Sequence, residues 1–297
     1  MSNEPLISAV FVASGDRLPH VVRLIDSLRG CPPGLVEVIA VDNASEPSVA
    51  GWLQQNFPQA RVVCNHDNVG TSRAYNAGML LAHGKYVLVV NDDCCLQENL
   101  LERSADFLDT HPEYDGLGLS LFNPDGSRQS TKLNLWSLRR ANLEKEQRIT
   151  FVGTNNLICK RDIFRLVGPF DENLFFYNED LEWSWRAHKK GVVFYYKPAL
   201  AIYHGYGLAR KPALSAERKL ARDIANTYVY RKHLPIVFPV AKALAKYALR
   251  RSLKRTGRAG LYSQLHELLN LECSEVVRGT YEVQKSLLTG GGFVGLV

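Results

Sequence analysis

The sequence predicts an α/β fold built on a largely parallel sheet with crossover helices. Short apolar runs in the first part of the chain alternate with segments whose apolar residues recur at helical spacing. Short turns join them, and a polar cluster follows each apolar run where a strand would end. Because ligands of such sheets lie outside the carboxyl ends of the strands, the pattern also predicts where a site would form.

Four strands and three helices are expected before residue 91. The segment 18–29 illustrates the helices, because its apolar residues recur on one face and Gly30 follows it. The segment 86–90 illustrates the strands, as a continuous apolar run typical of a buried strand. The expected strands are 6–13, 36–41, 60–64 and 86–90, and the expected helices are 18–29, 48–56 and 71–83.

The pattern changes after about residue 115, where strands of an antiparallel kind are expected. Residues 123–148 are polar and basic, which predicts a loop with a helical piece. From residue 215 onward the chain reads as helical, and Gly290–Gly292 indicates a frayed end. The expected elements of the middle part are strands at 116–121, 149–158, 191–196 and 199–203 and a helix at 180–190.

Composition restricts the class of protein. No run of 18 apolar residues is present in the 297, so no membrane-spanning helix is expected. The first residues lack a basic stretch before an apolar one, so we expect no signal peptide. Six scattered cysteines without a CxxC motif then indicate reduced thiols in a cytoplasmic protein.

Positive charge is concentrated late in the chain. Residues 210–258 hold 14 Lys and Arg against Glu217 and Asp223, whereas the rest of the chain is mildly acidic. Within this segment, 235–258 has apolar residues on one helical face and basic residues mostly on the other. Such a helix lies on the anionic inner face of the membrane, as in a peripheral protein, or packs on the main domain, and the two arrangements can coexist. Residues 261–271 are also amphipathic and are suited to packing or to a homodimer.

Two adjacent carboxylates end the fourth expected strand. Asp92 and Asp93 repel each other, and a divalent cation with oxygen ligands, Mg²⁺ or Mn²⁺, would offset that repulsion. We expect Cys94 and Cys95 to be packing residues, because they alternate across the sheet and lack the ligand spacing of a zinc site.

A second acidic group begins the helix expected at 180–190. Glu179, Asp180 and Glu182 precede or flank Trp183 and Trp185. Acids are favoured at a helix N-terminus for electrostatic reasons alone. Aromatic neighbours would also raise a carboxylate pKa toward that of a useful base and could form a wall for a sugar.

His204 follows at the end of an expected strand. A neutral imidazole there could supply a third ligand to a Mn²⁺ ion, although a lone histidine is more often a surface or core residue.

Three other functions are disfavoured. A dinucleotide-dependent oxidoreductase would carry GxGxxG after the first strand, where this chain has Ala13–Arg17. A sugar nucleotidyltransferase would need a Gly-rich basic loop there. Nucleic-acid binding lacks a fold signature, and the basic segment is joined to an acidic body.

The motifs, taken in order, resemble those of the family 2 inverting glycosyltransferases with the glycosyltransferase A fold, closest to rhamnosyltransferase-like members. The likeness covers about residues 5–210. It is carried by Val41–Ser45, Asn68–Gly78, Asn91–Asp93, Gly153–Phe164, Gly168–Asp171, Glu179–Trp183 and His204.

The resemblance implies a Rossmann-like mixed sheet flanked by helices, with a C-terminal helical extension. The catalytic domain would be 1–210, with a nucleotide-sugar half at about 1–115 and an acceptor half at about 116–210. The basic extension would be 211–297.

The resemblance, with the strand-end clusters, also implies roles for individual residues. Asp93 and His204 would hold Mg²⁺ or Mn²⁺, and Asp180 would be the catalytic base, with Glu179 and Glu182 shaping it. Asn91 stands where many members have an acidic residue, which shifts metal binding toward Asp93 and His204. The residues expected at the nucleotide sugar are Ser14, Arg17, Asp42, Asn43, Asn68, Arg73, Asn76 and Asp92, and those expected at the acceptor or sugar wall are Thr154, Asn155, Trp183 and Trp185.

The implied activity is transfer of a sugar, with inversion, from a nucleotide diphosphate sugar to a glycan or glycolipid hydroxyl. The expected donor is dTDP-L-rhamnose, with a UDP-sugar as the alternative. The expected acceptor is a precursor of a bacterial surface polysaccharide or lipopolysaccharide, and no nucleic-acid partner is expected.

Overall fold

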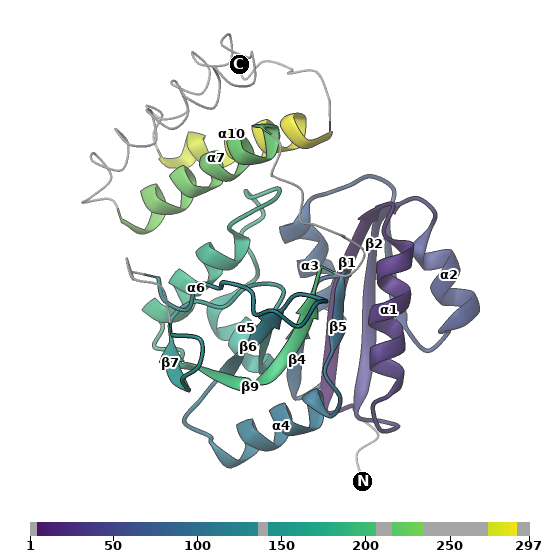
Figure 1. Ribbon diagram of the computed structural model, residues 1–297. Helices are drawn as coiled ribbons and strands as arrows, with labels where there is room; N and C mark the ends of the chain where they lie inside the picture. Colours follow the sequence, from purple (N-terminus) through teal and green to yellow (C-terminus); the bar gives the residue numbers. More distant parts are fainter. Residues whose placement is uncertain (1–4, 136–141, 206–215, 235–272, 290–297) are drawn as a thin grey trace. The chain divides into compact units, whose positions relative to one another are not determined.

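The computed structural model describes residues 5–135, 142–205, 216–234 and 273–289 (Figure 1). A mixed sheet of nine strands runs through these residues in the order β3-β2-β1-β4-β8-β6-β9-β5, and β7 pairs with β9. The strands are β1 (Ile7–Gly15), β2 (Val36–Ser45), β3 (Arg61–Asn65), β4 (Tyr86–Val89), β5 (Cys94–Leu96), β6 (Gly116–Phe122), β7 (Gln147–Ile149), β8 (Leu157–Lys160) and β9 (Phe194–His204). The helices are α1 (Leu18–Arg29), α2 (Val49–Asn56), α3 (Thr71–Met79), α4 (Leu100–Thr110), α5 (Arg161–Val167), α6 (Glu179–Lys189), α7 (Ala216–His233) and α10 (Cys273–Thr289).

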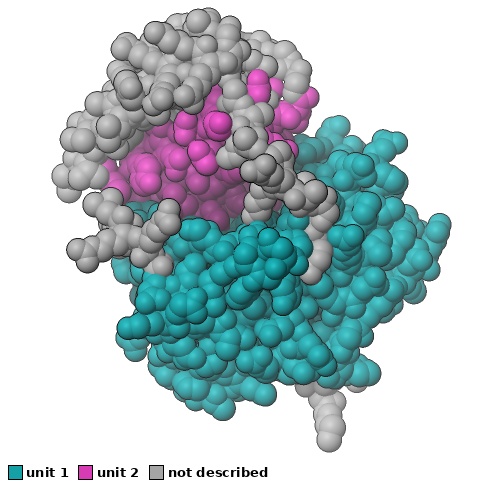
Figure 2. Space-filling view, viewed as in Figure 1, with its two compact units in different colours: residues 1–69, 74–170, 183–211 teal, residues 70–73, 171–182, 212–297 magenta. Residues whose placement is uncertain are grey.

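The chain divides into two compact units, coloured separately in Figure 2. Unit 1 contains residues 1–69, 74–170 and 183–211, and with them the whole sheet. Unit 2 contains residues 70–73, 171–182 and 212–297. Two short inner segments therefore belong with the C-terminal helices.

The direction of the strands brings seven chain segments to one edge of the sheet. β1 pairs in parallel with β2 and β4, and β2 pairs in parallel with β3, so their carboxyl ends share that edge. β8 runs antiparallel to β4 and therefore starts there. β6 and β9 are parallel to each other and antiparallel to β8, so both end there. The mixed sheet expected from the sequence is confirmed.

Helices cover both faces of the sheet in unit 1. One buried cluster joins Phe11 of β1 to apolar residues of α1, α2 and α4, including Leu24 and Leu53. The opposite cluster joins Val10 to α3, α5 and α6 through residues such as Tyr75 and Trp183. Neighbouring residues of β1 thus face opposite cores, which explains why this strand is apolar throughout.

Three expected strands of the middle part differ from the structure. The strand expected at 149–158 is interrupted by a turn, where Asn156 accepts a hydrogen bond from Gly153 N and donates one to Leu119 O. The strands expected at 191–196 and 199–203 form one strand, β9, whose register with β6 shifts between Lys197 and Ala201. Pro198 lies within this shift, where its missing N–H leaves no ladder hydrogen bond unmade.

The helical piece expected within 123–148 is not found in the described residues 123–135 and 142–148, and residues 136–141 lie outside the described ones. The chain instead turns back on itself after β6, with Phe122 bridging to Arg128. The backbone of Gln129 donates to Leu121 O at 2.8 Å. This return places Gln129 beside the end of β6.

Unit 2 is built from α7, α10 and two loops. α7 and α10 pack together, with Tyr228 and Tyr281 among the buried side chains. Gly70 has a φ of +83° and a backbone that passes so close to Phe175 that a Cβ would lie 2.5 Å from the Phe175 carbonyl oxygen. A glycine is required there because both the conformation and the contact exclude a side chain. The expected segments at 235–258 and 261–271 lie outside the described residues.

Candidate active site

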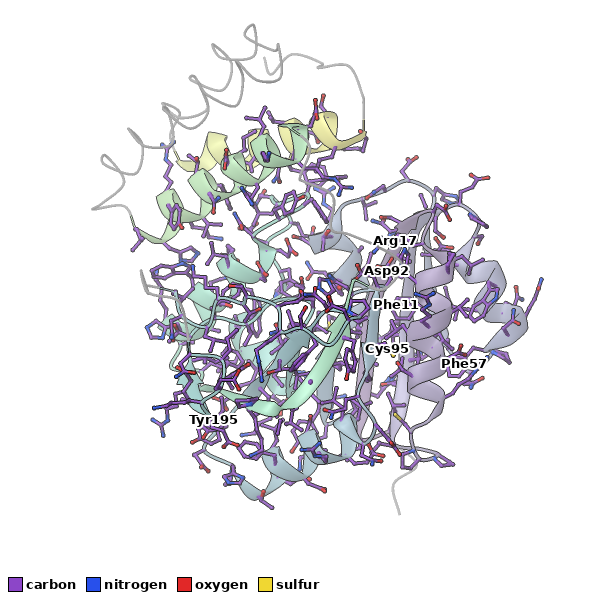
Figure 3. The ribbon with its side chains drawn as sticks, in the orientation of Figure 1. Phe11, Arg17, Phe57, Asp92, Cys95 and Tyr195 are labelled. Carbon is purple, nitrogen blue, oxygen red and sulfur yellow. The ribbon has the colours of Figure 1, made fainter. Side chains whose placement is uncertain are left out.

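Arg17 and Asp92 form the central ion pair of the sheet edge. Arg17 precedes α1, and its Nε and Nη2 donate to Asp92 Oδ2 and Oδ1 at 2.8 and 2.6 Å (Figure 3). Asp92 is buried, and burial raises the pKa of its carboxyl while Arg17 opposes that shift. The hydrogen bonds to Asp92 raise the pKa of Arg17 above its ordinary value despite its own burial, so Arg17 stays a cation. The Asp92 carboxylate is therefore already paired with a cation of the protein itself, the Arg17 guanidinium.

Asp93 and His204 meet across the end of the sheet. Their atoms Oδ1 and Nε2 are 3.3 Å apart, and Cys94 pairs in register with His204 across β5 and β9. Asp93 is 8% exposed, and its Oδ1 accepts no hydrogen bond from any described residue. A buried carboxylate oxygen in this state needs a cation or donor. The residues fit a hard divalent ion, with Asp93 and His204 as ligands.

Cys94 lies within reach of the same site. The ligand atoms of Asp93, Cys94 and His204 all lie within 4.8 Å of one another. Burial, followed by the charge of Asp93, raises the pKa of the Cys94 thiol well above its usual value. A protonated thiol is a poor ligand for a hard cation, so this agrees with the expected packing role.

Asp42 is surrounded by protein donors at the end of β2. Its two oxygens accept from Ser45 N and Oγ, Ser48 Oγ and Ala50 N, at 2.5–3.1 Å. Burial would raise the pKa of its carboxyl, but these hydrogen bonds outweigh burial and hold the pKa below its ordinary value. Asp42, one of the residues expected at the nucleotide sugar, thus anchors the start of α2.

Three asparagines link the ends of β2 and β3. Asn43 donates to Asn68 Oδ1 at 2.9 Å and accepts from Asn65 Nδ2 and Val69 N, both at 3.0 Å. This network fixes the loop that carries Asn68. Ser14 lies near the end of β1 at the same edge and is partly exposed.

Asn76 and Arg73 have structural contacts in different units. In unit 1, Asn76 donates to Phe170 O and accepts from Phe170 N at 2.9 and 2.8 Å. In unit 2, Arg73 lies over the ring of Tyr281, 4.0 Å from its centroid, and pairs with Glu172.

Of the four residues expected at the acceptor or sugar wall, two lie in a turn and two lie in the core. Thr154 and Asn155 form the turn before β8, at the edge that carries Asp93. Trp183 and Trp185 are 0% and 2% exposed. The Trp183 indole packs against Phe194 and other rings, and its Nε1 donates to Gly168 O at 3.0 Å. Both indoles are therefore core residues of unit 1, and neither offers a face to a sugar.

The acidic group at the start of α6 separates into one accessible and two buried carboxylates. Glu179 and Glu182 are 6% and 0% exposed, whereas Asp180 is half-buried. Tyr177 and Asn178 precede them with φ values of +69° and +64°, an uncommon conformation for residues with side chains. This bend starts the helix at Glu179, and Asp180 is the member of the group that a substrate could reach.

Glu182 belongs to a buried charge cluster that the sequence did not indicate. Its Oε1 lies 2.8 Å from Lys232 Nζ and 3.1 Å from His233 Nε2, both at the end of α7. Lys232 also contacts Asp171 Oδ2 at 2.7 Å, and Tyr228 donates to the same oxygen at 2.6 Å. The cluster ties the loop before α6 to α7 within unit 2. A basic helix end was visible in the sequence, but its pairing depends on tertiary contacts.

A family model described as glycosyl transferase family 2 matches residues 10–167, which is more than half of the chain. The chain belongs to glycosyl transferase family 2. The matched range runs from β1 to α5 and includes Arg17, Asp92 and Asp93. Asp180 and His204 lie beyond it.

Similar proteins include an N-acetylglucosaminyl-diphospho-decaprenol L-rhamnosyltransferase of Mycobacterium tuberculosis. It is 26% identical in an alignment 248 residues long that covers 71% of this chain and 80% of that protein. The minor teichoic acid biosynthesis protein GgaB of Bacillus subtilis is 29% identical over 122 residues, 40% of this chain and 13% of that protein.

Solved structures confirm the glycosyltransferase A fold for this family 2 member. S. aureus TarS in complex with UDP has a TM-score of 0.54 at 17% identity, covering 95% of this chain and 82% of that one. A mannosyltransferase from Pyrobaculum calidifontis, in complex with GDP-Man and Mn²⁺, has a TM-score of 0.56 at 15% identity, covering 97% and 87%. Among the described helices, none is long and apolar enough to cross a membrane.

Proposed function

We propose that this glycosyltransferase moves a sugar from a nucleotide diphosphate sugar to an acceptor hydroxyl, with inversion and with a divalent cation. One observation carries the proposal: buried Asp93 Oδ1 faces His204 Nε2 at 3.3 Å, at the sheet edge where seven chain segments meet. Two ligand atoms at this place are suited to Mg²⁺ or Mn²⁺. When bound, the ion would neutralise negative charge on the diphosphate as it departs.

Arg17 adds a fixed cation to the same edge. Its guanidinium is held by Asp92, and its Nη2 also lies 3.4 Å from Asp93 Oδ2. Because Asp92 holds Arg17 in place, the positive charge needs no rearrangement when an anionic diphosphate binds. We therefore assign Arg17 to the diphosphate of the donor and Asp92 to the support of Arg17.

Asp180 is the proposed catalytic base. Its carboxylate accepts the proton of the acceptor hydroxyl, and the oxygen forms a bond to the anomeric carbon. The bond from that carbon to the diphosphate breaks, and the nucleoside diphosphate leaves with the electron pair. A single displacement of this kind inverts the anomeric configuration and uses no covalent intermediate.

The name of the rhamnosyltransferase relative supports L-rhamnose as the sugar. We propose dTDP-L-rhamnose as its donor. The same name, and that of the teichoic acid relative, support a bacterial surface glycan or a lipid-linked precursor as the acceptor. UDP-sugars are the alternative donors, which the UDP complex of TarS favours.

The test is a screen of nucleotide sugars for nucleotide release, with Mn²⁺, Mg²⁺ or a chelator, in wild type and Asp180→Asn. We expect release that depends on the cation, and loss of turnover in Asp180→Asn with donor binding retained. Asp162→Asn is the matched control, because Asp162 is an exposed acid on α5 paired with Arg165. Turnover near the wild-type level in Asp180→Asn would refute the base assignment, and full activity with chelator would refute the metal.

A further inference from the structure

Gln129 lies beside His204, although no pattern in the sequence indicates a role for it. It is 9% exposed, and the chain return after β6 fixes its backbone on Leu121. Its side chain crosses to the end of β9 and contacts both the backbone and the ring of His204. Because this buried amide contacts a proposed metal ligand, its effect depends on whether its oxygen or its nitrogen faces the imidazole.

The amide of Gln129 has one orientation that satisfies its neighbours. Its Nε2 lies 2.7 Å from His204 O and 3.4 Å from Phe122 O. Carbonyl oxygens only accept hydrogen bonds, so the NH₂ group must face them. The amide oxygen Oε1 then faces His204 Nδ1 at 3.1 Å.

An amide oxygen only accepts, so His204 Nδ1 must carry the proton in this contact. In a neutral imidazole the other nitrogen, Nε2, is then an acceptor with a lone pair. This nitrogen is the one that lies 3.3 Å from Asp93 Oδ1.

Asn91 lies near the other nitrogen of the ring, with its Nδ2 3.5 Å from His204 Nε2. The Tyr75 hydroxyl has one proton, which Val90 O accepts at 2.9 Å, and the same hydroxyl lies 3.1 Å from Asn91 Oδ1. Tyr75 therefore does not fix the orientation of the Asn91 amide, and the tautomer is assigned from the contacts of Gln129.

We propose that Gln129 is a positioning residue that fixes His204 in the Nδ1–H tautomer and so presents the Nε2 lone pair, together with Asp93, to a divalent cation. This inference rests on the metal site of the proposed function. In the neutral ring two acceptor atoms then face each other at 3.3 Å, one of them on buried Asp93, and a shared cation resolves that conflict. Without the Gln129 acceptor, the ring could take the other tautomer and donate to Asp93, which would close the site.

The tautomer can be measured without metal or turnover. Nitrogen NMR of the full-length protein, with ¹⁵N-labelled histidine at a pH where the ring is neutral, distinguishes the two tautomers, and His204→Gln identifies the signal. We expect the Nδ1–H form in wild type and in Gln129→Glu, whose carboxylate still accepts from Nδ1. Gln129→Met lacks the acceptor and should show the Nε2–H form or a mixture.

The same variants should differ in their affinity for Mn²⁺. This affinity is measured by electron paramagnetic resonance of free Mn²⁺, with and without dTDP or UDP. Removal of a group that orients a metal ligand typically weakens binding about 10–100-fold, which we expect for Gln129→Met. Gln147→Met is the matched control, because Gln147 also donates to two backbone carbonyls but lies in β7 away from His204. Thermal unfolding of each variant reports whether it is folded.

The outcomes separate this inference from the proposed function. Mn²⁺ binding that is equal in wild type and Gln129→Met, or an Nε2–H tautomer in wild type, would overturn the role of Gln129 and leave the metal site standing. Wild type that binds no Mn²⁺ under either condition would overturn the metal site and this inference with it.

Discussion

The Arg17–Asp92 pair shows how one residue can serve both stability and binding. Arg17→Met would leave the buried Asp92 carboxylate without its cation. Breaking a buried pair in this way costs about 3–5 kcal/mol, because the remaining charge is uncompensated. We expect a lower melting temperature and weaker donor binding, measured by calorimetry and by titration with the nucleoside diphosphate.

Two comparisons sharpen that prediction. The double change Arg17→Met with Asp92→Leu removes both charges, so it should recover stability without recovering donor binding. Arg17→Lys keeps the charge but loses the bidentate geometry, so its donor affinity should lie between those of wild type and Arg17→Met. Unchanged donor affinity in Arg17→Met would contradict the assignment of Arg17 to the diphosphate.

Single residues also show where prediction from sequence ends. Asp93 could be singled out because adjacent carboxylates after an apolar run conflict within the local sequence. Gln129 could not, because its meaning depends on the approach of two chain segments 75 positions apart. The buried state of Trp183 was likewise hidden, since an aromatic residue beside acids has the same local pattern in a core as at a sugar site.

The loop before α6 depends on a buried glutamine of α10. Gln284 is 0% exposed; it accepts from Phe175 N at 2.9 Å and donates to Phe176 O and Ala221 O at 2.6 and 2.9 Å. Gln284→Met would leave these backbone groups unpaired, at about 1–3 kcal/mol for each group that stays buried.

Because that loop leads into the segment that carries Asp180, we expect kcat to fall in Gln284→Met with the donor KM nearly unchanged. Glu282→Met, at an exposed position of the same helix, is the control and should behave as wild type. Kinetics and thermal unfolding of both variants check the prediction. A rise in donor KM without loss of kcat would place Gln284 in a different role.

The ion cluster between α7 and the loop 171–182 should make unit 2 sensitive to acid. Burial alone would raise the pKa of the Asp171 carboxyl, but hydrogen bonds from Lys232 and Tyr228 outweigh it and lower the pKa below its ordinary value of 3.8. A carboxylate whose pKa is lower in the folded state stabilises the fold above that ordinary value, and this stability is lost as the pH falls through the folded-state pKa.

Urea unfolding at pH values from about 6 down to about 2 should therefore show stability falling at the acid end. The fall should be shallower in Asp171→Asn, which has no carboxylate to protonate. Other acidic residues also lose stabilising interactions at low pH in both proteins. The quantity to compare is therefore the difference in unfolding free energy between wild type and Asp171→Asn at each pH. Identical slopes would contradict the role of Asp171.

Elements that the local sequence defines could be predicted. Elements that depend on pairing with a segment far away in the chain could not. α1 was expected at 18–29 and is observed there, because its apolar face and the following Gly30 define it locally. β5, only three residues long, was not expected, since it exists through antiparallel pairing with the end of β9. The same pairing brings His204 to Asp93.

At the scale of the whole molecule, the sequence predicted a sheet with one ligand edge but not which segments group together. The loop 171–182, which carries Asp180, forms a unit with the C-terminal helices, whereas Asp93 and His204 belong to the sheet. Hydrogen bonds from α7 and α10 to that loop make this grouping, and residues so distant in the chain leave no local pattern.

The charge of the whole chain leads to a prediction about membranes. Residues 210–258 hold 14 basic and 2 acidic residues, although only part of the segment lies within the described residues. A basic residue close to an anionic bilayer contributes about 1 kcal/mol, and the attraction is screened by salt. We expect the protein to sediment with vesicles that contain anionic lipid and to be released from them at high salt. It should not sediment with neutral vesicles.

Charge reversal at matched positions tests whether the late segment is responsible. One variant changes four basic residues of that segment to Glu, namely Lys242, Lys246, Arg250 and Lys254. The control changes four exposed basic residues of unit 1 to Glu, namely Arg103, Arg165, Lys189 and Lys190. Both variants carry the same net charge, so loss of vesicle binding in the first alone locates the contact in the segment. Equal loss in both would mean that binding follows total charge, and the late segment would then have no specific part in it.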